Sequence, residues 1–200
     1  MRHGMLIDID HMSEKSQDAA IAIAKSQSNG AVSGYPLNSG HSGVRGFFPQ
    51  GIARRSDDAT ERSMDLSRYR EIALLHGMAG VGSAGLNSYQ WLEMYQQVVQ
   101  TTNGAVAGLG TDTDGLALGM PPRSASSVPY DDSFPRSSLG TKWWNYNTDG
   151  VAHYGMLADF VKDARTSPSL GFLIDNNLMF GADYFLQTWK KCETLKAGVK

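Results

Sequence analysis

The segment Leu6–His11 constrains the possible folds of this chain more than any other segment. It has the composition of a short apolar strand, and it ends in two carboxylates, Asp8 and Asp10, and one imidazole. Met12–Lys15 follows directly and has the composition of a helix start. A strand that ends in polar residues and leads at once into a helix is the repeating unit of α/β enzymes, whose functional residues lie at the C-terminal ends of the strands.

Two further segments end in the same way. Tyr35–His41 contains a predicted strand that leads to a histidine, and Ala105–Asp114 contains one that leads to Asp112 and Asp114. Strand and helix patterns alternate, which predicts a parallel sheet with right-handed crossovers, and four such units make half of a (β/α)₈ barrel. The predicted strands are 5–9, 35–39, 78–83 and 105–110, and the predicted helices are 13–25, 65–76, one capped by Asn87 or Ser88, 151–164 and 178–195.

Length and composition are those of one folded domain that spans residues 1–200. Apolar residues make up 41% of the 200 residues, which is enough to bury a sizeable core. The formal net charge is −2 and no block of Lys or Arg stands out, so we expect no nucleic-acid partner. We expect no membrane span, because no window of about 20 apolar residues is present. The single cysteine, Cys192, excludes an intrachain disulfide.

Three stretches need a local interpretation. Residues 118–147 form a long irregular loop, and loops of this length inside a domain are usually functional or mobile. The small-residue run Gly77–Gly85 indicates close packing rather than a ligand cradle. Gly108–Gly110 lacks the spacing and the lysine of a phosphate loop, which excludes a nucleotide site of that kind.

His11 and His41 are the first candidates for chemistry. They follow consecutive predicted parallel strands, so they are expected side by side at one rim of the sheet. Two neutral imidazoles at such a place suit a divalent metal such as zinc, with nearby carboxylates completing the shell. A structural role, in which each histidine is only hydrogen-bonded, remains open. One of Asp8 and Asp10 is expected to orient His11 or to cap the following helix.

Asp112 is the second candidate. A carboxylate at a strand end can bind a metal or accept a proton from a metal-bound water. The alternative is that Asp114–Gly115 forms a turn and Asp112 caps the following segment. A serine nucleophile activated by His41 is disfavoured, because adjacent residues on an extended strand point to opposite faces.

These motifs together resemble the renal (membrane) dipeptidase family, which are zinc metallopeptidases of the amidohydrolase superfamily. The matching pieces occur in the family's order and span nearly the whole chain. The resemblance implies a (β/α)₈ barrel with a two-zinc site that hydrolyses dipeptides and related amides. The matching pieces are Gly4–Ser13, Ser39–Ser42, Gly110–Gly115 and Gly181–Leu186.

The resemblance also implies roles for single residues. His11 and His41 correspond to the two histidines that hold one zinc ion, and Asp112 to the aspartate that handles the proton of the attacking water. Arg62 corresponds to the arginine that binds the substrate carboxylate, with Arg55 as the alternative.

The resemblance covers only the C-terminal half of the family's barrel. The family's His-x-Asp pair, its bridging glutamate and a further substrate-binding histidine belong to strands with no counterpart here. Asp10 stands where the family commonly has a small residue. No signal peptide is visible, and no compartment is predicted, because the resemblance covers only the C-terminal half of the family's barrel. Half a barrel leaves unpaired strand edges and an open interior, so we expect a homo-oligomer, a missing N-terminal half, or a flattened α/β sheet.

Three functional hypotheses follow. The first is a metal-dependent hydrolase that cleaves a small peptide-like substrate with a zinc-activated water. The second is a catalytically silent fragment or scaffold with a partial metal site. The third is a metal-dependent esterase or lactonase of the same superfamily, with a pocket built by the long loop.

Overall fold

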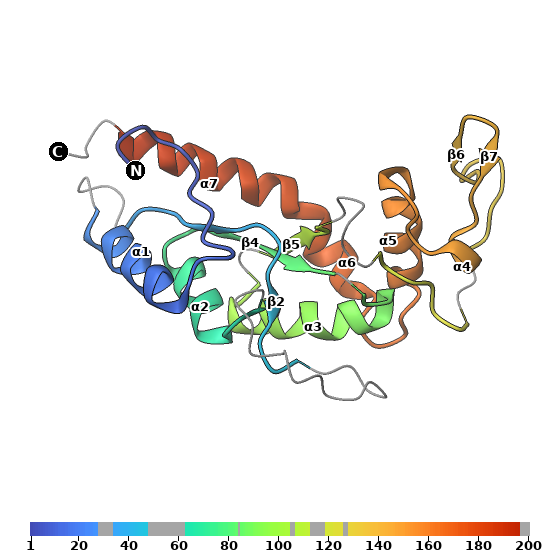
Figure 1. Ribbon diagram of the computed structural model, residues 1–200, viewed down its shortest axis with the longest axis horizontal. Coiled ribbons are helices and arrows are strands. Elements are labelled where there is room, and N and C mark those ends of the chain that lie inside the picture. The colour runs from blue at the N-terminus through green and yellow to red at the C-terminus, as the bar shows by residue number, and fades with distance from the viewer. Residues whose placement is uncertain are drawn as a thin grey trace.

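The computed structural model describes residues 1–27, 34–47, 63–83, 85–104, 107–112, 119–125 and 128–196. At its centre is a three-stranded parallel sheet in the order β1–β4–β5 (Figure 1). Helices alternate with these strands along the chain, so the predicted parallel α/β fold is confirmed. The three strands are β1 (Asn38–Ser39), β4 (Met78–Gly82) and β5 (Ala107–Gly110).

The predicted first strand is present only as a single bridge. Asp8 pairs in parallel with Asn38, and the N–H groups of Ile9 and Asn38 donate to the carbonyl oxygens of Asn38 and Ile7 at 2.9 Å. The pairing ends there because the Asp8 carboxylate accepts the N–H of Asp10 at 2.8 Å, which turns the chain. The strand is therefore shorter than predicted.

Three helices follow successive strands, as the sequence predicts. Each of α1 and α3 begins at a polar N-cap: the Ser13 hydroxyl accepts the N–H of Ser16, and Asn87 forms a capping box with Gln90. No helix in the described part of the chain is long and apolar enough to cross a bilayer. The three helices are α1 (Glu14–Ser26), α2 (Leu66–Leu74) and α3 (Ser88–Thr101).

Helices α2 and α3 pack on one face of the sheet. Ala79 and Val81 point to this face and are fully buried. Two aromatic side chains of α3 also bind strand carbonyls: Trp91 Nε1 donates to Val81 O at 3.2 Å, and the Tyr95 hydroxyl donates to Ala107 O at 3.0 Å. These bonds fix the position of α3 while its apolar stripe forms the core.

On the opposite face of the sheet, the residues of β4 and β5 are mainly glycines. Strand alternation directs the Cα positions of four glycines to this face, and the backbone of Gly40 and His41 lies directly on it. A Cβ at Gly80 or at Gly110 would overlap the carbonyl oxygen of Gly40. The glycine run therefore serves close backbone packing, as the sequence predicts. The four glycines are Gly80, Gly82, Gly108 and Gly110.

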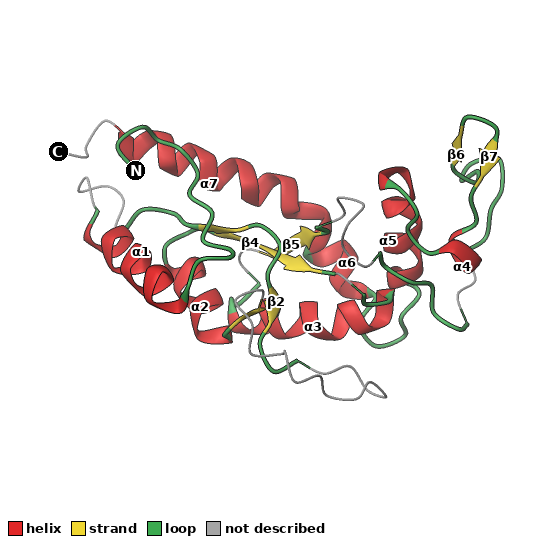
Figure 2. Ribbon diagram, viewed as in Figure 1, coloured by secondary structure: helices red, strands yellow, loops and turns green. Residues whose placement is uncertain are grey.

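Helix α7 (Gly181–Lys196) lies on the other side of the sheet from α2 and α3 (Figure 1; Figure 2). The Thr188 hydroxyl donates to the carbonyl oxygen of His76 at 3.3 Å, and Cys192 and Leu195 are fully buried. Among the described residues, the sheet therefore has cover on both faces instead of the open interior of a half barrel. The flattened α/β arrangement is the alternative that this geometry matches, and association with a second copy stays a prediction.

The predicted loop 118–147 contains short elements and is anchored on Asp163 of α5 (Leu157–Arg165), which also bonds α3. Arg123 binds Asp163 in a bidentate pair, with Nε–Oδ2 and Nη2–Oδ1 distances of 3.0 and 2.7 Å. The Ser88 hydroxyl donates to Asp163 Oδ2 at 2.5 Å. The predicted helix 151–164 begins later, as a 3₁₀ turn. The elements of this region are β6 (Ser138–Leu139), β7 (Lys142–Trp143), α4 (Tyr146–Asp149), η1 (Tyr154–Met156), α5 (Leu157–Arg165), α6 (Phe172–Asn176) and η2 (Leu178–Phe180).

Replacing Gly80 with Ala tests the glycine face. The new Cβ would overlap the Gly40 carbonyl, and backbone cannot move aside as a side-chain tip can, so we expect Gly80→Ala to lower the free energy of unfolding by about 1–3 kcal/mol or more in urea denaturation. Gly43→Ala is the matched control, because its Cβ would meet Ser63 and Met94 only at 3.8 and 3.9 Å. Equal stability of the two variants would contradict this packing.

Candidate functional site

His11 and His41 meet at the C-terminal ends of the first two parallel segments. His11 lies three residues after the bridge at Asp8, and His41 two residues after β1. Their Nε2 atoms are 2.7 Å apart, and their ring centroids are 4.8 Å apart. At this separation one Nε2 carries a proton and donates it to the other. The structure thus brings the two predicted metal ligands together.

Asp112 lies beside this pair. It follows β5, and its Oδ1 is 3.9 Å from Nε2 of His41. Its side chain is 44% exposed, so solvent reaches the carboxylate. Three residues from the ends of three parallel segments therefore converge at one rim, as the strand-end pattern predicts.

Two of these three residues have a left-handed backbone. The φ angle is 60° at His11 and 49° at Asp112. The other described non-glycine residues with positive φ, His76 and Asn103, each precede a glycine after a helix, where this conformation is common. His11 and Asp112 follow strands instead. Unfavourable backbone conformations concentrate at functional sites, so this strain supports a functional role for the pair of residues.

Asp10 lies behind His41 rather than behind His11. Its side chain is 2% exposed. Its Oδ1 accepts the hydroxyls of Ser39 and Ser42 at 2.7 and 2.6 Å, and its Oδ2 accepts the backbone N–H of His41 at 2.6 Å. Nδ1 of His41 is 3.4 Å from the same Oδ2. The prediction that Asp8 or Asp10 orients His11 or caps α1 is therefore wrong: Asp10 contacts the other histidine, and Ser13 caps the helix.

The segment after His41 is held from the helix side. The buried hydroxyl of Tyr69 on α2 donates to Ser42 O at 2.7 Å, and the N–H of Val44 donates to Met94 Sδ on α3 at 3.3 Å. Gly43–Val44 (β2) also pairs in parallel with Ser63–Met64 (β3), a short ladder that the sequence did not predict. Because both sides of this segment are bonded, His41 sits on a rigid support.

Imidazole nitrogens are suitable ligands for a divalent metal ion, but the distance between the two Nε2 atoms is shorter than in a bound site. Two Nε2 ligands on a tetrahedral zinc ion, each at about 2.0–2.1 Å, lie about 3.3 Å apart, so the 2.7 Å pair must open slightly to bind one ion. No group of three or more His, Cys, Asp or Glu side chains is arranged to hold a metal among the described residues. His11 and His41 are thus the candidate ligands that lie together in the described part of the chain.

The predicted substrate-binding arginines, Arg62 and Arg55, lie outside the described residues, and so does Asp114. The residue that follows Arg62, Ser63, is described: it pairs with Gly43, two residues after His41. The closest described arginine to this ladder is already paired. Arg45 binds Glu14 and Asp65 through Nη1 and the carbonyl oxygen of Ser63 through Nη2.

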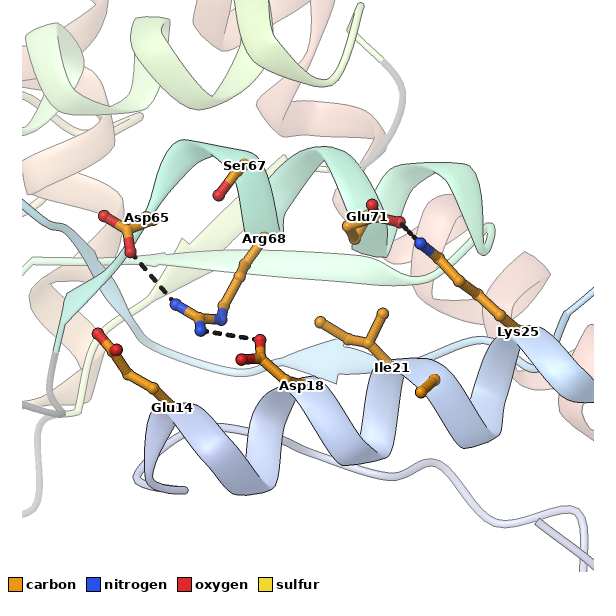
Figure 3. Close-up of a pocket in the computed structure, with 9 residues that line it drawn as sticks. Glu14, Asp18, Ile21, Lys25, Asp65, Ser67, Arg68 and Glu71 are labelled. Carbon is orange, nitrogen blue, oxygen red and sulfur yellow. Dashed lines mark hydrogen bonds and ion pairs between the residues drawn. The ribbon is translucent and has the colours of Figure 1, made fainter.

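A groove of about 450 Å³ lies between α1 and α2 (Figure 3). Arg68 binds Asp18 at 2.9 Å and Asp65 at 3.2 Å, and Lys25 Nζ is 2.7 Å from Glu71. Each charged side chain that lines the groove has an oppositely charged partner. Partly exposed ion pairs therefore link the two helices across the groove, and the histidine pair is not part of its lining.

The contact between Ser137 and His153 does not have the geometry of a serine nucleophile with its base. The Ser137 hydroxyl is 3.2 Å from His153 Nε2, and the N–H of Gly155 donates to His153 Nδ1 at 3.1 Å. Because Nδ1 accepts a hydrogen bond from Gly155, the neutral ring carries its proton on Nε2 and donates a hydrogen bond to Ser137. His153 cannot then act as a base toward this serine.

Comparison with known proteins gives matches among solved structures only. No protein-family model matches the chain, and no curated protein does. The dipeptidase AC, a metallopeptidase of family M19, has a TM-score of 0.61 and 14% identity over 96% of this chain and 45% of its own. A Rhodobacter sphaeroides metallopeptidase with a phosphinate mimic of the dipeptide L-Ala-D-Ala has the same TM-score and identity, over 96% and 43%. An amidohydrolase from Pseudomonas aeruginosa has a TM-score of 0.57 and 15% identity, over 96% and 53%.

These matches establish the fold. The chain spans about half the length of the proteins that it matches, and it has the fold of part of these metallopeptidases and amidohydrolases. The expected resemblance to the C-terminal half of such a barrel is therefore confirmed at the level of structure.

The carboxyl group of Asp8 makes the stability of the folded chain depend on pH. Burial raises the pKa of Asp8 above its usual value of 3.8, although bonds from Asp10 N–H and Asn38 oppose the rise. A carboxyl group with a raised pKa binds its proton more tightly in the folded chain, so it reduces stability as the pH rises above its unfolded pKa. In metal-free protein, the free energy of unfolding of the wild type should therefore fall relative to that of Asp8→Asn from about pH 4 to pH 7 in urea denaturation.

Asp131→Asn is a control of opposite sign. Hydrogen bonds from Ser133 and Phe134 lower the pKa of Asp131. Above the usual pKa of an aspartate, the wild type should therefore have a higher free energy of unfolding than Asp131→Asn. This difference should disappear as the pH falls through the lowered pKa of Asp131. An advantage of the wild type over Asp8→Asn that grows with pH would contradict the assignment for Asp8.

Proposed function

We propose that this chain is part of a metal-dependent hydrolase that cleaves dipeptides or related amides with a zinc-activated water. The observation that carries the proposal is the convergence of the Nε2 atoms of His11 and His41 to 2.7 Å at the strand C-termini, with Asp112 beside them. A fold shared with part of the M19 metallopeptidases supports it. The family resemblance of the motifs points in the same direction.

Each residue of the site has a defined task in this mechanism. His11 and His41 would hold the ion through Nε2, and the chemistry that zinc would supply there is a lowered pKa of a bound water and polarisation of the scissile carbonyl. Asp112 accepts the proton of the attacking water at its carboxylate and delivers it to the leaving amine. Its exposure to solvent and the 3.9 Å between its Oδ1 and Nε2 of His41 support this role.

Substrate binding is assigned to Arg62, with Arg55 as the alternative. A guanidinium group can bind the carboxylate of a dipeptide through two parallel hydrogen bonds. The pairing of Ser63 with Gly43 supports Arg62, because Ser63 is the next residue in the sequence and its partner Gly43 lies two residues after His41. The charge partners of Arg45 argue against that residue in the same role.

A silent chain with a partial metal site is the second candidate. It rests on the fact that only two clear ligands come from the described residues. Zinc binding without turnover would favour it. Hydrolysis of lactones or aryl esters in preference to dipeptides would instead favour an esterase or lactonase on the same fold.

Substitution of the site residues separates metal binding from catalysis. We expect His11→Ala and His41→Ala to lose both bound zinc, by elemental analysis, and dipeptide hydrolysis. Asp112→Asn should keep its zinc and lose about 10²–10⁴-fold in kcat, the usual contribution of a positioned acid–base group. His153→Ala is the control and should keep both properties. Unchanged zinc content and turnover in both alanine variants would refute the proposal.

Replacement of the arginines tests substrate binding. Loss of a bidentate bond to the substrate carboxylate should raise KM of Arg62→Met about 10- to 100-fold for dipeptides. The effect should be smaller for the corresponding dipeptide amides, which lack the carboxylate. Arg55→Met is the matched comparison, and a larger effect at Arg55 than at Arg62 would reverse the assignment.

A further inference from the structure

We propose that Asp10 is the positioning residue of the histidine pair: it fixes the main chain of His41 and places a negative charge beside its ring, so that the two Nε2 atoms converge. The inference rests on the proposed metal-dependent function and goes beyond it, because the resemblance to known dipeptidases implies no such residue. It concerns a carboxylate that this chain has where that family commonly has a small residue.

The first support is the cost of burying this carboxylate. Only 2% of the Asp10 side chain is exposed, and no Lys or Arg pairs with it in the described part of the chain. A buried carboxylate without a cation is expensive unless hydrogen bonds satisfy it. Three short bonds of 2.6–2.7 Å do so here, from Ser39, Ser42 and the His41 N–H. The surroundings of Asp10 therefore stabilise its negative charge with hydrogen-bond donors.

The second support is the position in the chain of the three donors that bind Asp10. Asp10 adjoins His11 in the sequence, and its three donors all belong to the segment 39–42, which contains His41. One carboxylate thus ties together the two strand ends that carry the two ligands. The glycine face supports the main chain of this segment, and Asp10 binds it from the end of the neighbouring parallel segment.

The third support concerns the imidazole of His41. Its Nδ1 is 3.4 Å from Asp10 Oδ2, and its Nε2 is 2.7 Å from Nε2 of His11. The negative charge of Asp10 near Nδ1 favours the ring proton on that atom, which leaves the Nε2 lone pair free to bind a metal ion. In metal-free protein, His11 then donates its Nε2 proton to His41. Asp10 therefore selects the ring form in which His41 is a ligand.

Zinc affinity and imidazole protonation test this role. Asp10→Ser removes the carboxylate contacts with the 39–42 segment, and we expect it to weaken zinc binding about 10- to 100-fold in a chelator competition, the usual effect of losing an outer-shell partner. Asp10→Asn keeps the size of the side chain and one acceptor oxygen, so its loss of zinc affinity should be smaller than that of Asp10→Ser. Asp159→Asn is the matched control, because Asp159 is also buried and accepts a hydroxyl, from Tyr130 at 2.6 Å, but lies on α5.

A purely structural role makes a different prediction. In that case Asp10→Ser and Asp159→Asn would both lower the melting temperature, and both would keep wild-type zinc affinity where they are folded. That result would overturn the inference and leave the proposed function intact. Absence of zinc binding by the wild type would instead refute the proposed function itself.

The ¹⁵N chemical shifts of the metal-free wild-type histidines give a test that needs no variant. We expect His41 to carry its proton on Nδ1 and His11 to carry its proton on Nε2. A proton on Nε2 of His41 in the neutral ring would overturn the inference even if Asp10→Ser does not fold.

Discussion

The close approach of two pieces of backbone determines the geometry of this molecule. Gly40 and His41 lie directly on the face of β4 and β5, and that approach is possible only because Gly80, Gly82 and Gly110 present no side chain there. On the other face, bulky side chains of α3 pack against Ala79 and Val81. The sheet thus has one face that forms an ordinary core and one that serves as a flat support. The support places a histidine where a barrel of this class has its chemistry.

The candidate site follows from this support by a short chain of contacts. Tyr69 and Met94 hold the segment after His41 from the helix side, and Asp10 holds it from the neighbouring strand end. The result is a pair of imidazoles with facing Nε2 atoms and a partly exposed carboxylate nearby. Such a set can bind a divalent ion and move a proton, which are the two functions that hydrolysis of an amide by a metal-bound water requires.

Some of this arrangement is visible in the sequence because its signals are local. Apolar runs that end in His11, His41 and Asp112 predict strand ends, and polar N-caps predict the starts of α1 and α3. Other features depend on contacts between residues far apart in the chain. The position of α7 across the sheet and the β2–β3 ladder are of this kind. So is the partner of Asp10, which lies 31 residues away at His41. No local pattern reports which strand end a buried carboxylate will face.

Zinc K-edge X-ray absorption of the wild-type protein tests the central claim most directly. The account predicts a first shell with two imidazole nitrogens at about 2.0–2.1 Å and oxygen atoms in the remaining positions. A shell with sulfur at about 2.3 Å, or one of oxygen atoms without imidazole, would place the ion elsewhere and contradict the account.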